Sequence, residues 1–371
     1  MKRLFIFCIL TQLFSFSAAA QLLADNDLKQ TIIKGLDKLY NYEFKEADTF
    51  FQKVKARYPH HPVTPLLSAL QVQWQNLPLE KNPKAVNLYM SLLEKCQALA
   101  EPMLKDAGKK AEATFFLLAS HGYITLAYTY RKEPMKAANE ARKAYSYMKD
   151  GFGMMERNPE FYFTSGLYNY YRIQYPETHP MVKPVVIFFE NGNKKAGLTQ
   201  LEQAVQKSVF SRIEAAYYFM NVNLKYELNY NKAFVYADLL HDKYPNNPIY
   251  LMRFTETLVM LGKYEEAIPK INTLRKINSS VYQIAANLFD GLVAEKSKKN
   301  DKLASDFYNN VLKNEPDERY TKDYYAMTYL GLGRIAQRAG NKKRAEDMFK
   351  KALDYAENKG IIAEAKKNLD K

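Results

Sequence analysis

Apolar residues recur along this chain at intervals of three and four, the spacing of one face of an α-helix. The pattern is clearest over residues 217–279, where two copies of one motif follow each other. The copies are Tyr230, Ala233, Ala237, Leu240, Pro245 and Tyr264, Ala267, Ile271, Leu274, Ser279. Ala233 and Ala267 stand 34 residues apart. The motif predicts successive helix pairs, in which a short Ala side chain lets two helices approach closely.

The same motif recurs elsewhere with less regularity. Phe44, Ala47 and Pro59 repeat it near the N-terminus, with the same twelve residues from Ala to Pro as in the first copy above. Four further copies are Ala85, Tyr89, Leu92; Ala137, Ala141, Ala144; Ala304, Tyr308, Val311; and Ala345, Phe349, Ala352. We expect all of these residues to pack helices together and to carry no chemistry.

The last unit adds Tyr329, Leu332-Gly333 and the turn Gly340-Asn341 to its Ala and Phe positions. Together they resemble the tetratricopeptide repeat, whose period is 34 residues. The unit departs from that consensus at Ala336, where Tyr is usual, and at Glu357, where Pro is usual. The resemblance covers roughly residues 25–149 and 197–371. It implies an all-α, right-handed helical solenoid of about eight irregular helix-pair units, with the basic segment 361–369 as a capping helix.

Residues 150–196 do not fit the repeat, because they are rich in aromatic residues and contain four prolines. We expect a helix over about 160–174, a proline-rich loop, a short helix near Val185 and a turn at 191–193. Gly166-Leu167-Tyr168, Phe188-Phe189, Gly192-Asn193 and Gly197-Leu198 resemble the middle of the tetratricopeptide repeat 39 family, which implies a scaffold and suggests no chemistry. The aromatic side chains either fill an irregular junction or line a recess for a peptide or sugar.

The first twenty residues read as a secretory signal peptide. Lys2 and Arg3 precede a mostly apolar stretch over residues 4–16, and three alanines at 18–20 form a cleavage site. We therefore expect a signal peptide at 1–20, N-terminal repeats at 21–149, the junction at 150–196 and C-terminal repeats at 197–371. The mature chain is expected to contain no transmembrane segment. Its expected place is the periplasm, the outer-membrane surface or the medium of a Gram-negative bacterium.

The chain is basic, with 54 Lys and Arg against 40 Asp and Glu and a net charge of +14. Such a charge raises nucleic acid as a partner, but export argues against it and favours acidic proteins, anionic glycans or lipid phosphates. A lysine-rich face that only meets water is the simpler interpretation.

Chemical motifs are weak throughout. Cys96 is the single cysteine of the expected mature chain, and the five histidines lack a second ligand at metal-binding spacing. His60-His61 is expected on the surface of an interhelical loop. Ser146 and Lys149 match a Ser-x-x-Lys nucleophile pattern without its companion motifs. We predict no catalytic residue, no metal site and no cofactor.

The tetratricopeptide resemblance implies that the first helix of each pair lines a concave groove. The residues that this register places inward are Tyr218, Val222, Tyr226, Met252, Glu256, Met260, Phe289, Val293, Arg334 and Arg338. Such a groove is aromatic and rich in Met with a basic end, which suits a protein or peptide partner with acidic flanks. The other interpretation is that longer loops or neighbouring helices cover several of these positions. The alternative is a glycan-binding module, since outer-membrane proteins of the starch-utilisation type also use tetratricopeptide scaffolds. Those proteins are usually longer and lipid-anchored, and this chain lacks a convincing lipidation cysteine.

Overall fold

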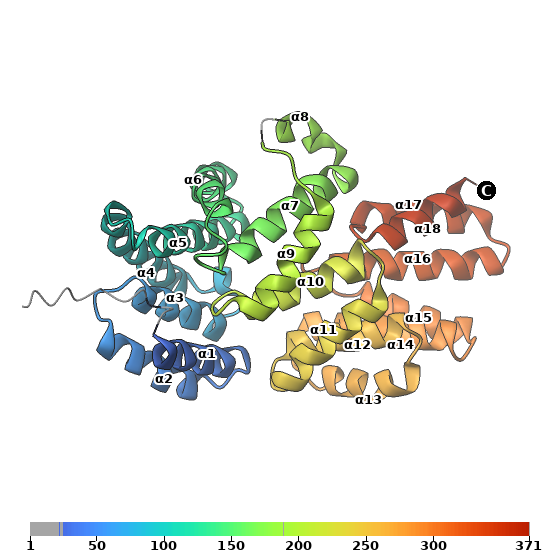
Figure 1. The fold of residues 1–371 in the computed structure, drawn as a ribbon. Coiled ribbons are helices and arrows are strands. Elements are labelled where there is room, and N and C mark those ends of the chain that lie inside the picture. The colour runs from blue at the N-terminus through green and yellow to red at the C-terminus, as the bar shows by residue number, and fades with distance from the viewer. Residues whose placement is uncertain (1–21, 23–24, 188, 371) are drawn as a thin grey trace, which may run out of the picture.

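A computed structural model describes residue 22 and residues 25–187 and 189–370 of the chain. The expected signal peptide, residues 1–20, lies outside the described residues. Every regular element in the described ranges is helical, and no strand occurs among them. This confirms the all-α prediction (Figure 1).

The described helices pack as eight successive pairs, in a solenoid-like arrangement. The first four pairs are α1 (Asn26–Tyr40) with α2 (Phe44–Arg57), α3 (Val63–Gln75) with α4 (Pro83–Ala100), α5 (Lys110–Tyr130) with α6 (Pro134–Phe152), and α7 (Phe161–Thr178) with α9 (Lys194–Lys207). The last four are α10 (Arg212–Lys225) with α11 (Tyr230–Lys243), α12 (Pro248–Met260) with α13 (Tyr264–Arg275), α14 (Ser280–Lys296) with α15 (Asp301–Val311), and α16 (Lys322–Arg338) with α17 (Lys342–Tyr355). A final helix, α18 (Lys359–Leu369), packs on α17 where a capping helix was expected.

Short elements fill some of the connections. They are the 3₁₀ helices η2 (Leu79–Lys81), η3 (Glu101–Lys105) and η4 (Pro180–Val182), and the one-turn helix α8 (Lys183–Val186).

Several helices begin at an asparagine that caps them. The side chain of Asn229 accepts a hydrogen bond from the N–H of Lys232 at the start of α11, and Asn341 does the same for the N–H of Arg344 at the start of α17. Each cap satisfies a backbone donor that the first turn of a helix leaves unpaired. The starts of these helices are therefore determined by residues close to them in the sequence.

The small residues of the repeat motif lie where two helices meet. Ala233 and Ala267 are fully buried on α11 and α13, at equivalent places in their pairs. The residues expected to pack in α15 and α17 are buried as well. In α6 only Ala137 of the three alanines is buried, while Ala141 is exposed, because most of that helix faces solvent.

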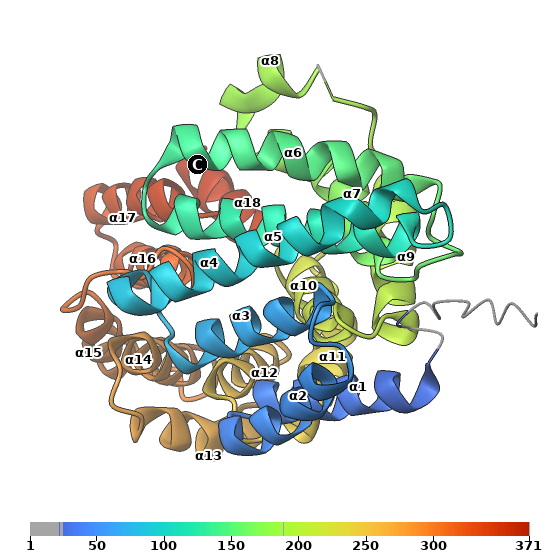
Figure 2. The same cartoon turned by 90° about the vertical axis from the view of Figure 1, so that its left-hand side faces the viewer.

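The segment expected to be an irregular junction contains the first helix of a pair. An added Cβ on Gly197 of α9 would lie 2.6 Å from the backbone nitrogen of Tyr170 and 2.9 Å from the carbonyl oxygen of Gly166, both in α7. Backbone atoms cannot move aside as a flexible side chain can, so only glycine permits this approach. Residues 179–187 and 189–193, which include the expected short helix as α8, belong to an insertion that projects from the pair (Figures 1 and 2).

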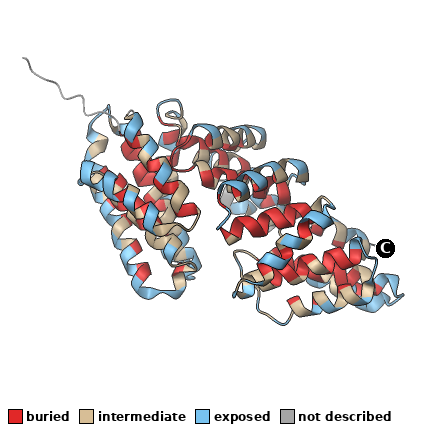
Figure 3. Ribbon diagram, turned by 90° about the horizontal axis from the view of Figure 1, so that it is seen from below, coloured by how far each residue is buried: buried red, intermediate tan, exposed pale blue. Residues whose placement is uncertain are grey.

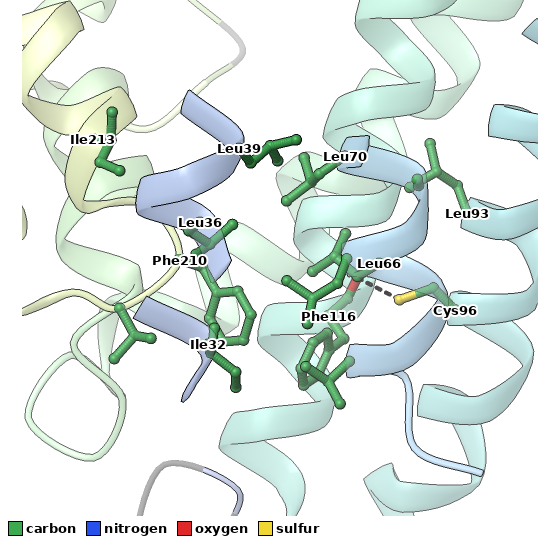
Figure 4. Packing of buried hydrophobic residues seen from close by; sticks show 14 of the residues in the cluster. Ile32, Leu36, Leu39, Leu66, Leu70, Leu93, Cys96, Phe116, Phe210 and Ile213 are labelled. Carbon is green, nitrogen blue, oxygen red and sulfur yellow. Dashed lines mark hydrogen bonds between the residues drawn. The ribbon is translucent and has the colours of Figure 1, made fainter. Parts of the chain in front are cut away.

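The N-terminal pairs pack against the middle of the chain. Ile32 and Leu36 of α1 share one buried cluster with Phe210 and Ile213 at the start of α10 (Figure 4). The side chain of Asn247 donates to the carbonyl oxygen of Tyr40 at 2.8 Å. The core therefore joins segments about 180 to 210 residues apart, and buried residues run through both halves of the molecule (Figure 3).

Polar bonds reinforce this packing. Asp37 of α1 accepts hydrogen bonds from the guanidinium of Arg212 and, at 2.6 Å, from the hydroxyl of Tyr244. Cys96 lies in the same buried cluster, where its sulfur is 3.9 Å from the carbonyl oxygen of Phe116 (Figure 4). Burial raises the pKa of this thiol, so the residue serves as a packing group.

A buried carboxylate fixes the entry to α10. Glu160, 1% exposed, accepts hydrogen bonds from the N–H groups of Val209, Phe210 and Ser211, and from the hydroxyl of Ser211 at 2.6 Å. Consecutive N–H groups of the 208–211 loop thus converge on one side chain from the preceding pair. This arrangement sets the direction in which α10 leaves the loop.

Candidate functional site

Helix α10 presents a stripe of partly exposed residues. Glu214, Tyr217, Tyr218 and Lys225 keep accessible surface, at helical spacings of three, four and seven residues. Val222 and its apolar neighbours on the opposite side are buried. The exposed stripe of this helix therefore runs through Tyr217 as well as through Tyr218.

Partly exposed tyrosines from several parts of the chain gather around this stripe. We call this set the tyrosine cluster. Its members are Tyr42, Tyr130, Tyr171, Tyr217, Tyr218, Tyr226, Tyr282 and Tyr320. They come from α5, α7, α10, α14, the residue that ends α10 and the loops that follow α1 and precede α16.

Two pairs of rings in the cluster are in contact, and electrostatic interactions link further members. The ring centroids of Tyr217 and Tyr218 are 6.1 Å apart, and those of Tyr171 and Tyr226 are 5.9 Å apart. Burial raises the pKa of Tyr282 and of Tyr218, and the phenol of Tyr217 adds to both shifts. The phenol of Tyr217 adds in the same way to the shifts at Tyr171 and Tyr320. These phenols keep accessible surface and are nevertheless desolvated by their neighbours.

Cations stand beside the cluster, and each is paired with a carboxylate. Arg319 bonds to Glu80 at 3.2 Å, and its guanidinium lies 3.6 Å from the ring centroid of Tyr130. Lys225 pairs with Asp323 at 2.6 Å.

A third such pair is fully buried. Arg253 on α12 bonds at 2.7 Å to Glu256, and both side chains contact the hydroxyl of Tyr324. Because charge is balanced locally in all three pairs, the tyrosine cluster is chemically an array of aromatic rings and hydroxyl groups.

Glu214 is the one carboxyl of the α10 stripe. It accepts hydrogen bonds from the hydroxyls of Tyr40 and, at 3.4 Å, of Tyr123. Burial raises the pKa of Glu214 to about 7, against the opposing effect of the Tyr40 hydrogen bond. The carboxyl therefore gains and loses a proton near neutral pH.

The structure divides the residues that sequence predicted for the groove. Tyr218 and Tyr226 belong to the tyrosine cluster, and Met260 is partly exposed. Five of the residues are buried and serve packing: Val222, Met252, Glu256, Phe289 and Val293. The physical reason is close packing between neighbouring pairs. Val222 lies in one buried cluster with Tyr170 and Leu201, Met252, Phe289 and Val293 lie in another with Tyr324 of α16, and the loop before α16 also contacts α12. That loop reaches α12 through the carbonyl of Tyr320, 3.5 Å from Arg253.

The expected basic end of the groove is neutralised. Arg334 forms a two-pronged pair with Glu295 at 2.8 and 2.6 Å, and Arg338 pairs with Asp301 at 2.9 and 2.6 Å. Burial alone would raise the pKa of Glu295, but the bonds and charge of Arg334, with the hydroxyl of Tyr308, lower it to about 2. Both guanidinium groups are thus engaged by carboxylates.

Most of the cluster was not singled out from the sequence. Tyr42 and Tyr320 lie in loops, and Tyr42 adopts a positive φ of 62°. Tyr130, Tyr171 and Tyr282 lie on helices that the repeat motif does not relate to α10. The available signal was the total of 29 tyrosines, which is a property of the whole chain and points to no position.

Two of the residues considered for other chemistry, His61 and Lys149, have structural partners. His61 was expected on the surface, but its ring packs edge-on against Tyr58 and Phe116, and burial lowers its pKa to about 4. Ser146 is exposed on α6, and Lys149 pairs with Glu190 at 3.2 Å. Within the ranges described, no three His, Cys, Asp or Glu side chains are placed to hold a metal ion. None of the described helices is long and apolar enough to cross a bilayer.

An open depression of about 480 Å³ lies between α11, α12 and α13. Asp238, Asp242, Glu266 and Lys270 give it a charged lining. The ring of His241 stacks on Phe254 there, with centroids 4.9 Å apart. Charged side chains predominate in this lining, and its aromatic rings are those of His241 and Phe254. The depression therefore differs in chemical character from the tyrosine cluster.

No model of a known protein family matches this chain, and no curated protein matches its sequence.

Proposed function

We propose that this protein is an exported, non-catalytic scaffold built as a right-handed tetratricopeptide-type solenoid, and that the tyrosine cluster is its binding surface. The observation that carries the proposal is the gathering of eight partly exposed tyrosines, Tyr217 among them, from several helices and two loops. Export rests on the signal-like residues 1–20. The repeat class rests on the 34-residue motif and on the succession of helix pairs.

A tyrosine surface suits an extended peptide segment. Each ring offers a flat apolar face, and each hydroxyl can donate to or accept from a peptide group. Buried hydrogen bonds such as those of Glu160 hold α10 and its tyrosines in place, so little ordering entropy opposes binding. Because Arg334 and Arg338 already face carboxylates, the proposal does not depend on acidic flanks in the partner.

The test is a double variant, Tyr217→Ala with Tyr218→Ala. The partner is captured with the chain from Gln21 onward, purified and titrated. The variant is expected to bind it at least about tenfold more weakly, since two aromatic contacts are lost. Tyr128→Ala is the matched control, because Tyr128 is partly exposed on α5 and lies outside the cluster. Equal affinity of the double variant and the control would reject the cluster as the binding surface.

The same lining supports a glycan as the second candidate ligand. Sugar rings stack on aromatic faces while their hydroxyls bond to polar groups, and the cluster offers both kinds of contact. A binding isotherm with cell-surface polysaccharide separates the two. Saturable sugar binding that the Tyr217 and Tyr218 substitutions abolish would assign the surface to a glycan.

A further inference from the structure

The insertion between α7 and α9 exposes apolar side chains to water. Met181 is 93% exposed and Ile187 72% exposed, and Phe189 keeps 38% of its surface. Met181 and Ile187 flank the one-turn helix α8, which stands clear of the helix pairs in both views of the fold (Figures 1 and 2). We call residues 181–187 the apolar tip.

The base of the insertion is firmly held. The ring of Phe189 packs edge-on against Tyr145 of α6, with centroids 5.0 Å apart. The carbonyl oxygen of Glu190 accepts from the hydroxyl of Tyr168 at 2.5 Å and from Arg172 at 3.1 Å. The tip is therefore presented by a fixed support and lies on the same side of the molecule as α6.

Helix α6 and the turn before it are basic and exposed. Residues 131–150 contain six Lys and Arg against three Asp and Glu. Lys136, Arg142, Lys143 and Lys149 are all exposed. Three acids, Glu133, Glu140 and Glu190, pair with Lys136, Lys143 and Lys149 at 2.6, 2.8 and 3.2 Å, so the cations remain in excess on this surface. Lys183 adds an exposed charge on the tip itself.

We propose that the apolar tip and α6 together dock this protein on an anionic phospholipid surface. Apolar side chains flanked by cations are the combination that binds a membrane interface, because the side chains enter the acyl boundary while the cations attract lipid phosphates. The tip is convex and only seven residues long, which is too small for a stable protein interface of standard size. A fluid bilayer can close around such a projection, whereas a protein partner needs a matching cavity. The proposal concerns a different face from the tyrosine cluster and does not depend on its ligand.

The experiment is flotation with lipid vesicles, using the chain from Gln21 onward. This chain keeps every described residue and lacks the apolar N-terminal stretch that would itself bind lipid. We expect binding to vesicles that contain phosphatidylglycerol and much weaker binding to phosphatidylcholine alone. Added salt is expected to reduce the bound fraction, since surface attraction is screened.

Two variants and one control test the parts separately. Met181→Asp with Ile187→Asp is expected to weaken partitioning at least about tenfold, because apolar burial is replaced by charge. Arg142→Glu with Lys183→Glu is expected to remove the preference for phosphatidylglycerol. Val235→Asp with Leu239→Asp on α11 is the control, since these side chains are also apolar and exposed, at 58% and 43%. Circular dichroism verifies that all three remain folded.

Three outcomes would overturn the proposal. The first is failure of the unmodified chain to bind anionic vesicles. The second is equal binding by the tip variant and the α11 control. The third is that the unmodified chain is a dimer and does not bind vesicles, while the tip variant is a monomer. That result would assign the tip to self-association.

Discussion

The guanidinium of Arg319 lies 3.6 Å from the centre of the Tyr130 ring, although the two residues belong to opposite halves of the chain. Arg319 precedes α16, and Tyr130 ends α5. The same guanidinium bonds to Glu80 in η2. One side chain thus fastens the C-terminal pairs to the N-terminal pairs at the edge of the tyrosine cluster.

We expect Arg319→Ala to lower the free energy of unfolding by about 2 kcal/mol, because it removes a cation–π contact and leaves Glu80 without its partner. Arg319→Lys is expected to lose less, since it keeps the charge but not the planar stack. Urea denaturation measures both. A larger radius of gyration in Arg319→Ala by small-angle scattering would show that the halves separate, and unchanged stability in both variants would contradict the role given to this contact.

The second prediction concerns the buried carboxylate of Glu160. Glu160→Ala leaves the buried N–H groups of Val209, Phe210 and Ser211 without their acceptor, at an expected cost of about 3 kcal/mol. Glu160→Gln keeps one oxygen acceptor and should cost less. Glu265→Ala, on an exposed turn of α13, is the control and is expected to change stability by less than about 0.5 kcal/mol. Thermal or chemical unfolding of the three variants decides the matter, and a Glu160→Ala protein as stable as the control would refute the assignment.

Glu214 predicts a pH dependence. Its folded pKa of about 7 lies above the ordinary value of 4.5, so the folded chain holds a proton that the unfolded chain has released. Stability from this group is therefore greatest below pH 4.5 and falls as pH rises towards 7, by at most about 3 kcal/mol. Glu214→Gln should flatten that part of the stability curve.

Glu112 shifts in the same direction, because burial raises its pKa to about 7 as well. Glu112→Gln should therefore remove a separate share of the slope, and the double variant should lose both. Unfolding free energies measured at several pH values between 4.5 and 7.5 provide the check. A Glu214→Gln slope identical to that of the unmodified chain would contradict a raised pKa at this carboxyl.

Gly197 supplies the last prediction. Gly197→Ala forces a Cβ to within 2.6 Å of the Tyr170 backbone, so α7 and α9 must separate, with an expected loss of about 2 kcal/mol. Gly122→Ala is the matched control, because an added Cβ in the middle of α5 would meet no atom within 4 Å. That control should gain up to about 1 kcal/mol from helix propensity. Opposite signs in the melting temperatures of the two variants are the expected result, and a neutral Gly197→Ala would contradict the close approach.

The local features of this protein could be read from its sequence. Helix starts at Asn229 and Asn341 depend on a side chain and a backbone group three residues away. The burial of Ala233 and Ala267 depends on a motif confined to one helix pair. Such interactions span few residues, so helical spacing and capping residues suffice to predict them.

The membership of the tyrosine cluster depended on tertiary structure. Tyr218 and Tyr226 were predicted to face inward and do lie in the tyrosine cluster, whereas Met252, Phe289 and Val293 were predicted with them and are buried. Small rotations between pairs accumulate along a solenoid, and in this chain they bring α1 beside the start of α10. No single helix pair encodes that sum.

The ion pairs of α16 show the same division between what the sequence and what the tertiary structure determined. The sequence determined that Arg334 and Arg338 stand together near the end of α16, because they are four residues apart on one helix. Only the tertiary structure decided that Glu295 and Asp301, about 40 residues earlier, would occupy both guanidinium groups. The sequence by itself therefore determined the helices, their pairing and their small packing residues, which depend on short-range contacts. Which side chains remain accessible, and which charges remain unpaired, was decided by long-range closure of the array.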